Sequence, residues 1–145
     1  MKVAIGTDHN GPALKEEIIN KLSDIAEFID CSPVNDPLDD YPDFAYKVSE
    51  MVASGKADLG ILICGTGIGM SIVLNKMKGV YCAKVSNESE AILCRSHNNA
   101  NVIAMSEEID HEVMKKIVNN FIETPFSNVS KYIRRNNMIK EIENE

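Results

Sequence analysis

Residues 59–64, Leu-Gly-Ile-Leu-Ile-Cys, form an uninterrupted apolar run of strand length near the middle of the chain. A strand that is apolar on both faces is typical of the centre of a parallel sheet covered by helices on both sides. Four other apolar segments have the length of strands: Lys2–Gly6, Glu27–Cys31, Val80–Val85 and Asn101–Met105. The central run therefore predicts a parallel sheet of about five strands, provided that helices connect them.

The segments between these runs have the periodicity of helices. After Pro12, which suits a first helical turn, Leu14, Ile18, Leu22 and Ile25 recur at helical spacing and define one apolar face. The helical segments expected are 12–25, 44–52, 69–78, 89–96, 113–122 and about 129–144. Strands that alternate with helices form right-handed βαβ units, which cover both faces of the sheet. We therefore expect one α/β domain over residues 1–145, a three-layer αβα sandwich with a Rossmann-like sheet.

Charge, hydropathy and cysteine spacing exclude several classes of protein. The formal net charge of −7 argues against a nucleic-acid partner, because neutralising phosphates requires a basic face. No apolar run reaches the roughly 18 residues of a membrane span. The first residues, Met-Lys-Val-Ala-Ile-Gly, indicate a strand rather than a secretory leader. The cysteines form no C-x-x-C pair, so reduced thiols in a cytoplasmic protein are expected; they are Cys31, Cys64, Cys82 and Cys94.

The charge is distributed unevenly along the chain. Acidic residues crowd the loop that contains Asp36, Asp39, Asp40 and Asp43, whereas residues 124–140 contain no acid. The basic residues of that C-terminal stretch are Lys131, Arg134, Arg135 and Lys140. A basic segment of this size suits a small anion better than a polymer, although a solvated helix face has the same pattern.

The central strand continues into Cys64-Gly-Thr-Gly-Ile-Gly69, the most distinctive motif in the chain. Glycines at alternate positions let the backbone turn so that successive N–H groups face one concavity at a helix N-terminus, where an anion is stabilised. The same field favours the thiolate of Cys64. An aldose–ketose isomerisation needs a base beside such donors, because a proton moves between two carbons while an enediolate forms.

Two other interpretations of this motif stay open. Cys64 is an inert core residue if its side chain only packs at the end of the strand. The glycines are also partly similar to a dinucleotide-binding fingerprint, which would make the chain a nucleotide-binding module without catalysis. That fingerprint fits poorly, since no acidic residue ends the next strand, where Lys84 and Val85 stand.

Further polar residues lie next to the predicted strands. Asp8 and His9 follow the first strand, at the edge of the sheet where Cys64 is expected and where ligands of such sheets bind. They would contact the hydroxyls or the phosphate of a sugar, unless Asp8 only caps the next helix. His97 and Asn98 instead precede the fifth strand, and a histidine in that place is often only a helix C-cap.

Together these segments resemble ribose-5-phosphate isomerase type B, a family that includes the galactose-6-phosphate isomerase subunits. The resemblance covers essentially the whole chain. Its motifs are Gly6-Thr-Asp-His-Asn-Gly11, Asp40-Tyr-Pro-Asp-Phe-Ala45, Gly60-Ile-Leu-Ile-Cys-Gly-Thr-Gly-Ile-Gly-Met-Ser71, Asn75-Lys76 and His97-Asn-Asn-Ala-Asn-Val102. The Cys-Gly-Thr-Gly-Ile-Gly block in a βαβ frame, followed by His-Asn-x-x-Asn, is a specific signal.

The resemblance implies a reaction, a site and an assembly. The residues that align with the family's catalytic groups are Cys64 as the base, Thr66, and His97 as the ring-opening histidine. Those that align with its substrate contacts are Asp8, His9, Gly65, Gly67, Ile68, Gly69, Asn98, Lys131 and Arg135. The family implies a small phosphorylated sugar as substrate and neither a metal nor an organic cofactor. It also implies a homodimer or tetramer with shared sites, in which the C-terminal helix reaches the partner subunit.

The sequence departs from the family at its phosphate-binding arginines. Lys131 replaces one of them in the tail, and Glu108 stands where another follows the fifth strand. We expect the turn at Glu108 to be rebuilt so that its side chain points to solvent, the alternative being that Arg134 neutralises it. The expected reaction is the interconversion of ribose 5-phosphate and ribulose 5-phosphate. A 6-phospho-hexose, allose or galactose 6-phosphate, is the alternative substrate, because an altered anion clamp could accept a longer chain.

Overall fold

The computed structural model describes residues 1–145, whose strands form one parallel sheet with helices on both faces. The strands are β1 (Lys2–Thr7), β2 (Glu27–Asp30), β3 (Leu59–Cys64), β4 (Cys82–Lys84) and β5 (Val102–Ser106). The helices are α1 (Pro12–Lys21), α2 (Tyr41–Ala53), α3 (Ile68–Leu74), α4 (Glu88–Ser96), α5 (His111–Glu123) and α6 (Ser130–Glu143). The strand order is β2-β1-β3-β5-β4, and all neighbours are parallel. The predicted α/β fold with about five strands is confirmed.

β3 occupies the centre of the sheet, and every one of its residues is buried. Because side chains alternate along a strand, Ile61 and Ile63 join the apolar core on one face, while Leu62 and Cys64 join the core on the other. The uniform apolar run is thus explained by helices on both sides.

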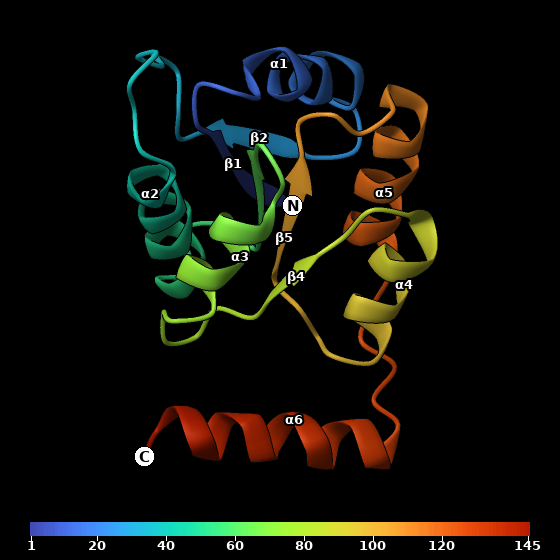
Figure 1. Cartoon of the computed structure of the whole chain (residues 1–145). Helices are drawn as coiled ribbons and strands as arrows, with labels where there is room; N and C mark the ends of the chain where they lie inside the picture. The colour runs from blue at the N-terminus through green and yellow to red at the C-terminus, as the bar shows by residue number, and fades with distance from the viewer.

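Two helical layers cover the sheet (Figure 1). On one face, α1, α4 and α5 contribute residues such as Ile18, Ala91 and Phe121 to the larger core cluster. On the other face, α2 and α3 contribute residues such as Val48 and Met70. Cys64 belongs to this second face, so the helix that follows its loop packs on the same side as its thiol.

The segment between α3 and β4 differs from the predicted boundaries. α3 ends at Leu74 instead of continuing to about Lys78, and β4 covers only Cys82–Lys84 of the predicted 80–85. The side chain of Asn75 accepts a hydrogen bond from the Cys82 N–H at 2.8 Å and donates one to the Cys82 carbonyl at 3.0 Å. Asn75 therefore ends the helix by pairing with the next strand, a contact that helical periodicity does not reveal.

α6 lies apart from the two layers and crosses the bottom of the molecule in Figure 1. None of its residues is buried. Near its start the Tyr132 ring stacks on His97, with ring centroids 4.1 Å apart. Near its end Glu143 accepts hydrogen bonds from the Tyr81 hydroxyl and the Gly79 N–H, both at 2.7 Å. Neither α6 nor any other helix is both long and apolar enough to cross a membrane.

Candidate active site

Cys64 ends β3 and is buried, with its sulfur facing the loop that follows. The Gly67 N–H donates to Cys64 Sγ at 3.1 Å, and the Ile68 N–H donates to Thr66 Oγ1 at 3.1 Å. Gly67 has a left-handed backbone with φ +82°, and a Cβ there would lie 3.1 Å from the Met105 carbonyl carbon. A glycine is therefore needed to aim this amide at the sulfur.

The same loop offers further donors. The backbone N–H groups of Gly65, Thr66 and Gly69 donate to no group within the chain. They lie at the start of α3 beside the Cys64 sulfur, where amide dipoles stabilise negative charge. A thiol and a turn whose amides lack acceptors thus lie together, which is the geometry that the predicted anion site requires.

The loop after β1 contacts the loop after β3. Asp8 is buried, and its Oδ1 accepts a hydrogen bond from the Asn10 N–H at 3.0 Å. Asp8 is not the helix cap that was the alternative interpretation, because Gly11 occupies the N-cap of α1. The Asn10 amide nitrogen lies 3.7 Å from where a Cβ on Gly65 would stand. Asp8, His9 and the Cys64 loop therefore share one edge of the sheet, as expected.

The Asp-rich loop supplies two neighbours that the sequence did not reveal. Asp39 Oδ1 lies 2.8 Å from His9 Nδ1, and this hydrogen bond raises the pKa of His9 above its ordinary value of 6.5. The ring of Tyr41, the first residue of α2, lies so close to Gly69 that an added Cβ would collide with it. The motif at residues 40–45 pointed to this region without assigning either contact.

The turn after β5 closes another side of this edge. Ser106 Oγ donates to the Gly65 carbonyl at 2.8 Å, and the Glu107 N–H donates to the Cys64 carbonyl at 2.9 Å. The Glu108 N–H in turn donates to Ser106 Oγ at 3.2 Å. Glu108 itself is exposed and forms no ion pair, with Arg134 or with any other residue of the chain.

The remaining predicted site residues lie at the opposite edge of the sheet. His97 is the C-cap of α4 and precedes β5, whose carboxyl end adjoins Cys64. The length of β5, at about 3.3 Å per residue, puts roughly 15 Å between the two edges. His97 is joined to α6 by the stacked Tyr132 ring and by its carbonyl, which accepts from Asn136 at 2.9 Å.

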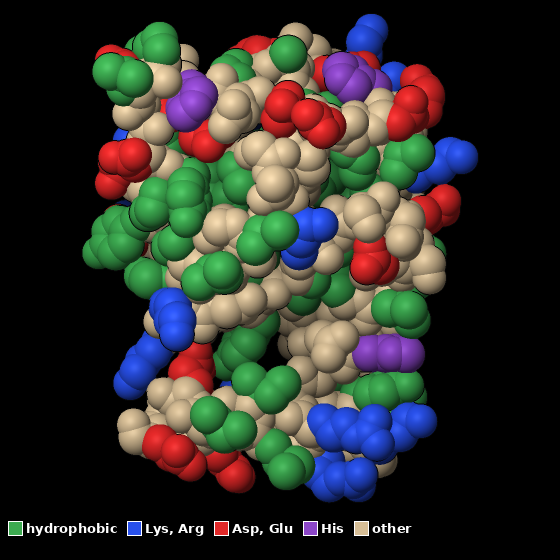
Figure 2. Space-filling model, in the orientation of Figure 1, with side chains coloured by type: hydrophobic (Ala, Val, Ile, Leu, Met, Phe, Trp, Pro, Cys, Tyr) green, Lys and Arg blue, Asp and Glu red, His purple; other side chains and the backbone are tan.

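Asn98, Lys131 and Arg135 accompany His97 at that second edge. Asn98 and Asn136 line a pocket of about 260 Å³ between α6 and the rest of the chain. The Lys131 ammonium lies 5.0 Å from the centre of the Tyr132 ring, and Arg135 is exposed on the same helix. Figure 2 shows Lys and Arg side chains gathered where α6 begins. The predicted site residues of one chain therefore fall into two separate groups, the Cys64 half-site and the His97 half-site.

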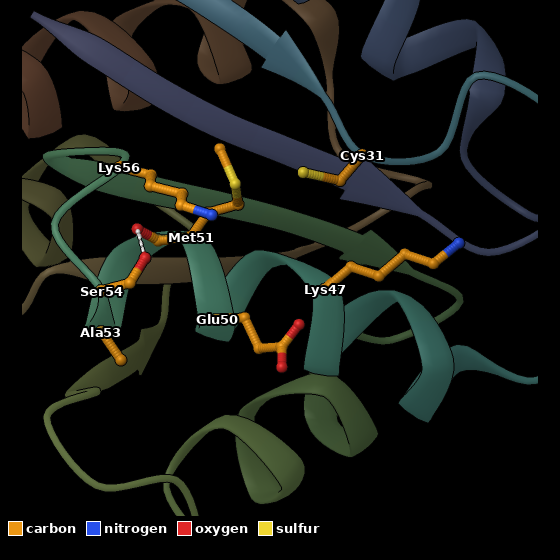
Figure 3. A pocket seen from close by; sticks show the side chains of 7 residues that line it. All are labelled: Cys31, Lys47, Glu50, Met51, Ala53, Ser54 and Lys56. Carbon is orange, nitrogen blue, oxygen red and sulfur yellow. Dashed lines mark hydrogen bonds between the residues drawn. The ribbon is translucent and has the colours of Figure 1, made fainter.

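The largest cavity, about 630 Å³, contains none of these residues. Figure 3 shows its lining side chains from α2, the turn after it and the end of β2; they are Cys31, Lys47, Glu50, Met51, Ala53, Ser54 and Lys56. The single hydrogen bond among them joins Ser54 Oγ to the Met51 carbonyl at 3.3 Å. Its polar groups do not converge on one point. The Cys64 loop is therefore the better candidate for the active site, although this cavity is larger.

Comparison with known proteins gives consistent matches over most of the chain. The model of the ribose/galactose isomerase family matches residues 3–139. A putative sugar phosphate isomerase of Bacillus subtilis is 46% identical over 112 residues, which are 75% of this chain and 74% of that protein. Ribose-5-phosphate isomerase B of Escherichia coli is 43% identical over 119 residues, 81% of this chain and 80% of that one.

A solved structure extends the match to the fold. The crystal structure of ribose-5-phosphate isomerase B from Mycoplasma genitalium with bound ribulose 5-phosphate superposes with a TM-score of 0.93. The two sequences are 39% identical, and the match covers 99% of this chain and 97% of that one. The parallel sheet and its flanking helices are therefore shared with a protein that holds a phosphorylated ketose.

Proposed function

The chain belongs to the ribose/galactose isomerase family, and we propose that it interconverts ribose 5-phosphate and ribulose 5-phosphate through an enediolate, with Cys64 as the base. It is a sugar-phosphate aldose–ketose isomerase. The observation that carries the proposed mechanism is the Cys64 sulfur within 3.1 Å of the Gly67 N–H, beside backbone amides without partners. We assign the whole of residues 1–145 to this one isomerase domain.

The proposed reaction moves one proton between neighbouring carbons. The Cys64 thiolate takes the proton from C2 of the open-chain aldose, and the electron pair forms the C1–C2 double bond while the C1 oxygen becomes negative. The amides of Gly65, Thr66 and Gly69, which have no acceptor within the chain, are the donors that would stabilise this oxygen. The thiol then returns the proton to C1, and the proton of the C2 hydroxyl passes to the negative C1 oxygen, so that C1 becomes CH2OH and the C2 carbonyl of the ketose forms.

The other site residues are assigned to ring opening and binding. His97 and the Thr66 hydroxyl would move the proton between the ring oxygen and the anomeric hydroxyl, a step that suits an imidazole because its two nitrogens can donate and accept a proton. The residues proposed to hold the substrate are Asp8, His9, Gly65, Gly67, Ile68, Gly69, Asn98, Lys131 and Arg135.

We further propose a homodimer, alone or paired into a tetramer, in which each site combines the Cys64 half-site of one subunit with the His97 half-site of the other. The two half-sites of a single chain lie at opposite edges of the sheet, which favours completion by a partner. Exposed apolar residues support such an interface; they are Ile68 and Ile72 on α3 and Ile133, Met138, Ile139 and Ile142 on α6.

A 6-phospho-hexose is the second candidate substrate, favoured by Glu108. This exposed carboxylate belongs to the turn that is hydrogen-bonded to Cys64 and Gly65, at a position where the family resemblance implies an arginine. A changed anion clamp there would suit a longer sugar chain. A cytoplasmic location is also proposed, supported by four cysteines that are all free thiols.

Replacing Cys64 tests the mechanism. We expect Cys64→Ala to lower turnover of ribose 5-phosphate by about a hundredfold or more, the size of a general-base contribution. Cys94→Ala is the matched control, because Cys94 is 6% exposed where Cys64 is 5% exposed. Burial raises the pKa of the Cys94 thiol to about 11. Near-full activity of Cys64→Ala would refute Cys64 as the base. Assaying wild type on ribose, allose and galactose phosphates decides between the substrates.

A further inference from the structure

His9 is held by a carboxylate from a distant part of the sequence. Asp39 Oδ1 lies 2.8 Å from His9 Nδ1 and also accepts the His9 backbone N–H at 2.9 Å. The second oxygen of Asp39 accepts a hydrogen bond from the Asn35 side chain at 2.9 Å. Because a carboxylate only accepts hydrogen bonds, Nδ1 of His9 must carry its proton, which leaves Nε2 as the nitrogen available to a ligand.

The loop that carries Asp39 is braced against the end of β1. Asn35 Nδ2 donates to the Thr7 carbonyl at 2.9 Å, and Ser32 Oγ accepts from the Thr7 N–H at 2.9 Å. The buried Lys15 ammonium donates to the Ser32 carbonyl at 2.7 Å and pairs with Asp30 at 3.0 Å. The position of Asp39 is thus set by buried groups rather than by solvent, and His9 meets a preformed acceptor.

The charges around His9 favour its protonated form. Only 10% of the Asp39 side chain is exposed, and burial alone would raise its pKa, but hydrogen bonds from Asn35 and His9 outweigh burial and the pKa is lowered. The Asp39 hydrogen bond, together with the negative charge of Asp8, raises the pKa of His9 despite its own desolvation. The His9–Asp39 ion pair therefore exists between the lowered pKa of Asp39 and the raised pKa of His9.

The loops at the edge of the sheet around Cys64 otherwise contribute no cationic side chain, and the ammonium of Lys15 behind them is buried and paired with Asp30. The loops that meet there are residues 8–11, 31–40, 65–67, 85–87 and 106–110, and none of them contains a lysine or an arginine. They do contain acids, which are Asp8, Asp36, Asp39, Asp40, Glu107, Glu108 and Asp110. A phosphorylated ligand would be repelled by this half-site unless a positive charge were supplied, and His9 is the one side chain in these loops that can supply it.

We propose that Asp39 is a positioning residue that holds His9 as a cation with Nε2 directed to ligand, so that the Cys64 half-site attracts the phosphoryl group of the sugar. This rests on the proposed function. Asp39 does not touch substrate; it acts through the tautomer, the orientation and the charge of His9. Asn35 and Ser32 extend this support to the backbone of β1.

Asp39→Asn removes the charge of residue 39 with little change in its shape. The amide keeps an oxygen that accepts both His9 N–H groups, while its NH2 group replaces the oxygen that accepts from Asn35. We expect the titration midpoint of His9, followed by NMR of the imidazole Cε1–H in the free protein, to fall in Asp39→Asn. Asp36→Asn is the matched control. It makes the same charge change in the same loop, where Asp36 Oδ1 only accepts the Leu38 N–H at 2.8 Å, and it should leave the midpoint nearly unchanged.

Binding is measured against pH with inorganic phosphate and with ribose 5-phosphate. At neutral pH we expect Asp39→Asn to raise the KM for ribose 5-phosphate roughly tenfold, the loss of about one hydrogen bond to a charged group. We expect kcat to change less, and the affinity for inorganic phosphate to fall in parallel with the rise in KM. As the pH is lowered and His9 becomes protonated in both proteins, the ratio of the two KM values should approach one.

A purely structural role for Asp39 would leave the His9 midpoint unchanged in Asp39→Asn, or would keep the KM ratio constant with pH; either result overturns the proposal. The proposed function fails separately. A wild-type protein that isomerises no phosphosugar would refute it, even if the His9 midpoint still depended on Asp39, because the midpoint is read without turnover.

Discussion

Gly55 and Gly67 share one backbone conformation, but a side chain would have different effects at the two positions. Gly67 and Gly55 both have left-handed backbones, with φ of +82° and +79°. A Cβ on Gly55 would meet nothing within 4 Å, whereas one on Gly67 would press on the Met105 backbone. Only Gly67 also aims its amide at Cys64 Sγ. Comparing the two positions therefore separates the loss of stability due to the backbone conformation from the loss of activity due to a displaced Gly67 amide.

Alanine at each position tests this difference. We expect Gly55→Ala to lower the free energy of unfolding by about 1–2 kcal/mol, the cost of a side chain in this conformation. Gly67→Ala should lower it by more, because its Cβ also presses on the Met105 backbone. Gly67→Ala should also reduce turnover at least tenfold, because its amide leaves the sulfur. Denaturant unfolding and the isomerase assay measure the two effects. Equal turnover in the two variants would contradict a role for the Gly67 amide.

The role of Glu108 depends on whether its side chain points toward the phosphate or toward solvent. Two like charges about 5 Å apart at an effective dielectric near 20 repel by about 3 kcal/mol. A carboxylate that faced the phosphate would weaken substrate binding by too much for a working site. We therefore expect Glu108→Arg to change the KM for ribose 5-phosphate little, in keeping with its exposed place on the turn. Glu107→Arg, one residue earlier, is the control. A tenfold or larger fall in KM for Glu108→Arg alone would show that the carboxylate faces the phosphate.

At the scale of elements, α6 depends on its two ends. It buries no residue, so stacking of Tyr132 on His97 near its start and the Tyr81–Glu143 hydrogen bond at its end hold it in place. Burial, followed by the bond to Glu143, raises the pKa of Tyr81 to about 12. A tyrosine with a raised pKa contributes stability below its unfolded value of 10 and loses it as the pH rises toward 12. The bond is therefore formed across the neutral range.

Tyr81→Phe should release the end of α6 while leaving the sheet intact. We expect amide hydrogen exchange in residues 139–143 to become several-fold faster, because a hydrogen bond to a charged group is lost. Exchange in β3 should not change. Tyr46→Phe is the control, since Tyr46 and Glu50, the carboxylate that raises its pKa, both belong to α2. Unchanged exchange in α6 would mean that the helix is held without the Tyr81 hydroxyl, by the Tyr132 end and by the Gly79 N–H bond to Glu143.

At the scale of the whole molecule, the two half-sites predict complementation between chains. Cys64→Ala and Arg135→Ala homo-oligomers should each be nearly inactive. After subunits exchange, a mixed dimer would contain one site with both defects and one with neither, so activity should recover to at most half the wild-type value per dimer. Mixing Cys64→Ala with Cys64→Ser is the control and should recover none. Failure of the first mixture, once exchange is verified by mass spectrometry, would place each site within one chain.

The sequence by itself determined the elements and the edge that carries Cys64. Apolar periodicity is a local property, so the buried run at β3 and the helical repeats around it predicted an α/β sheet. Parallel strands end at one edge, which is why Asp8 and His9 could be expected near the Cys64 loop. The position of His97 before β5 likewise predicted a different environment from that of Cys64.

Only the tertiary structure decided the contacts between loops. Asp39 reaches His9 across 30 positions of sequence, and Tyr41 reaches Gly69 only because α2 and α3 pack on the same face. The early end of α3 likewise depends on the side chain of Asn75 meeting β4. Periodicity reports which face of an element is buried, but not the path of a loop. That path depends on buried groups such as Lys15 and Ser32, which come from different elements and meet only when the sheet and its helices are packed.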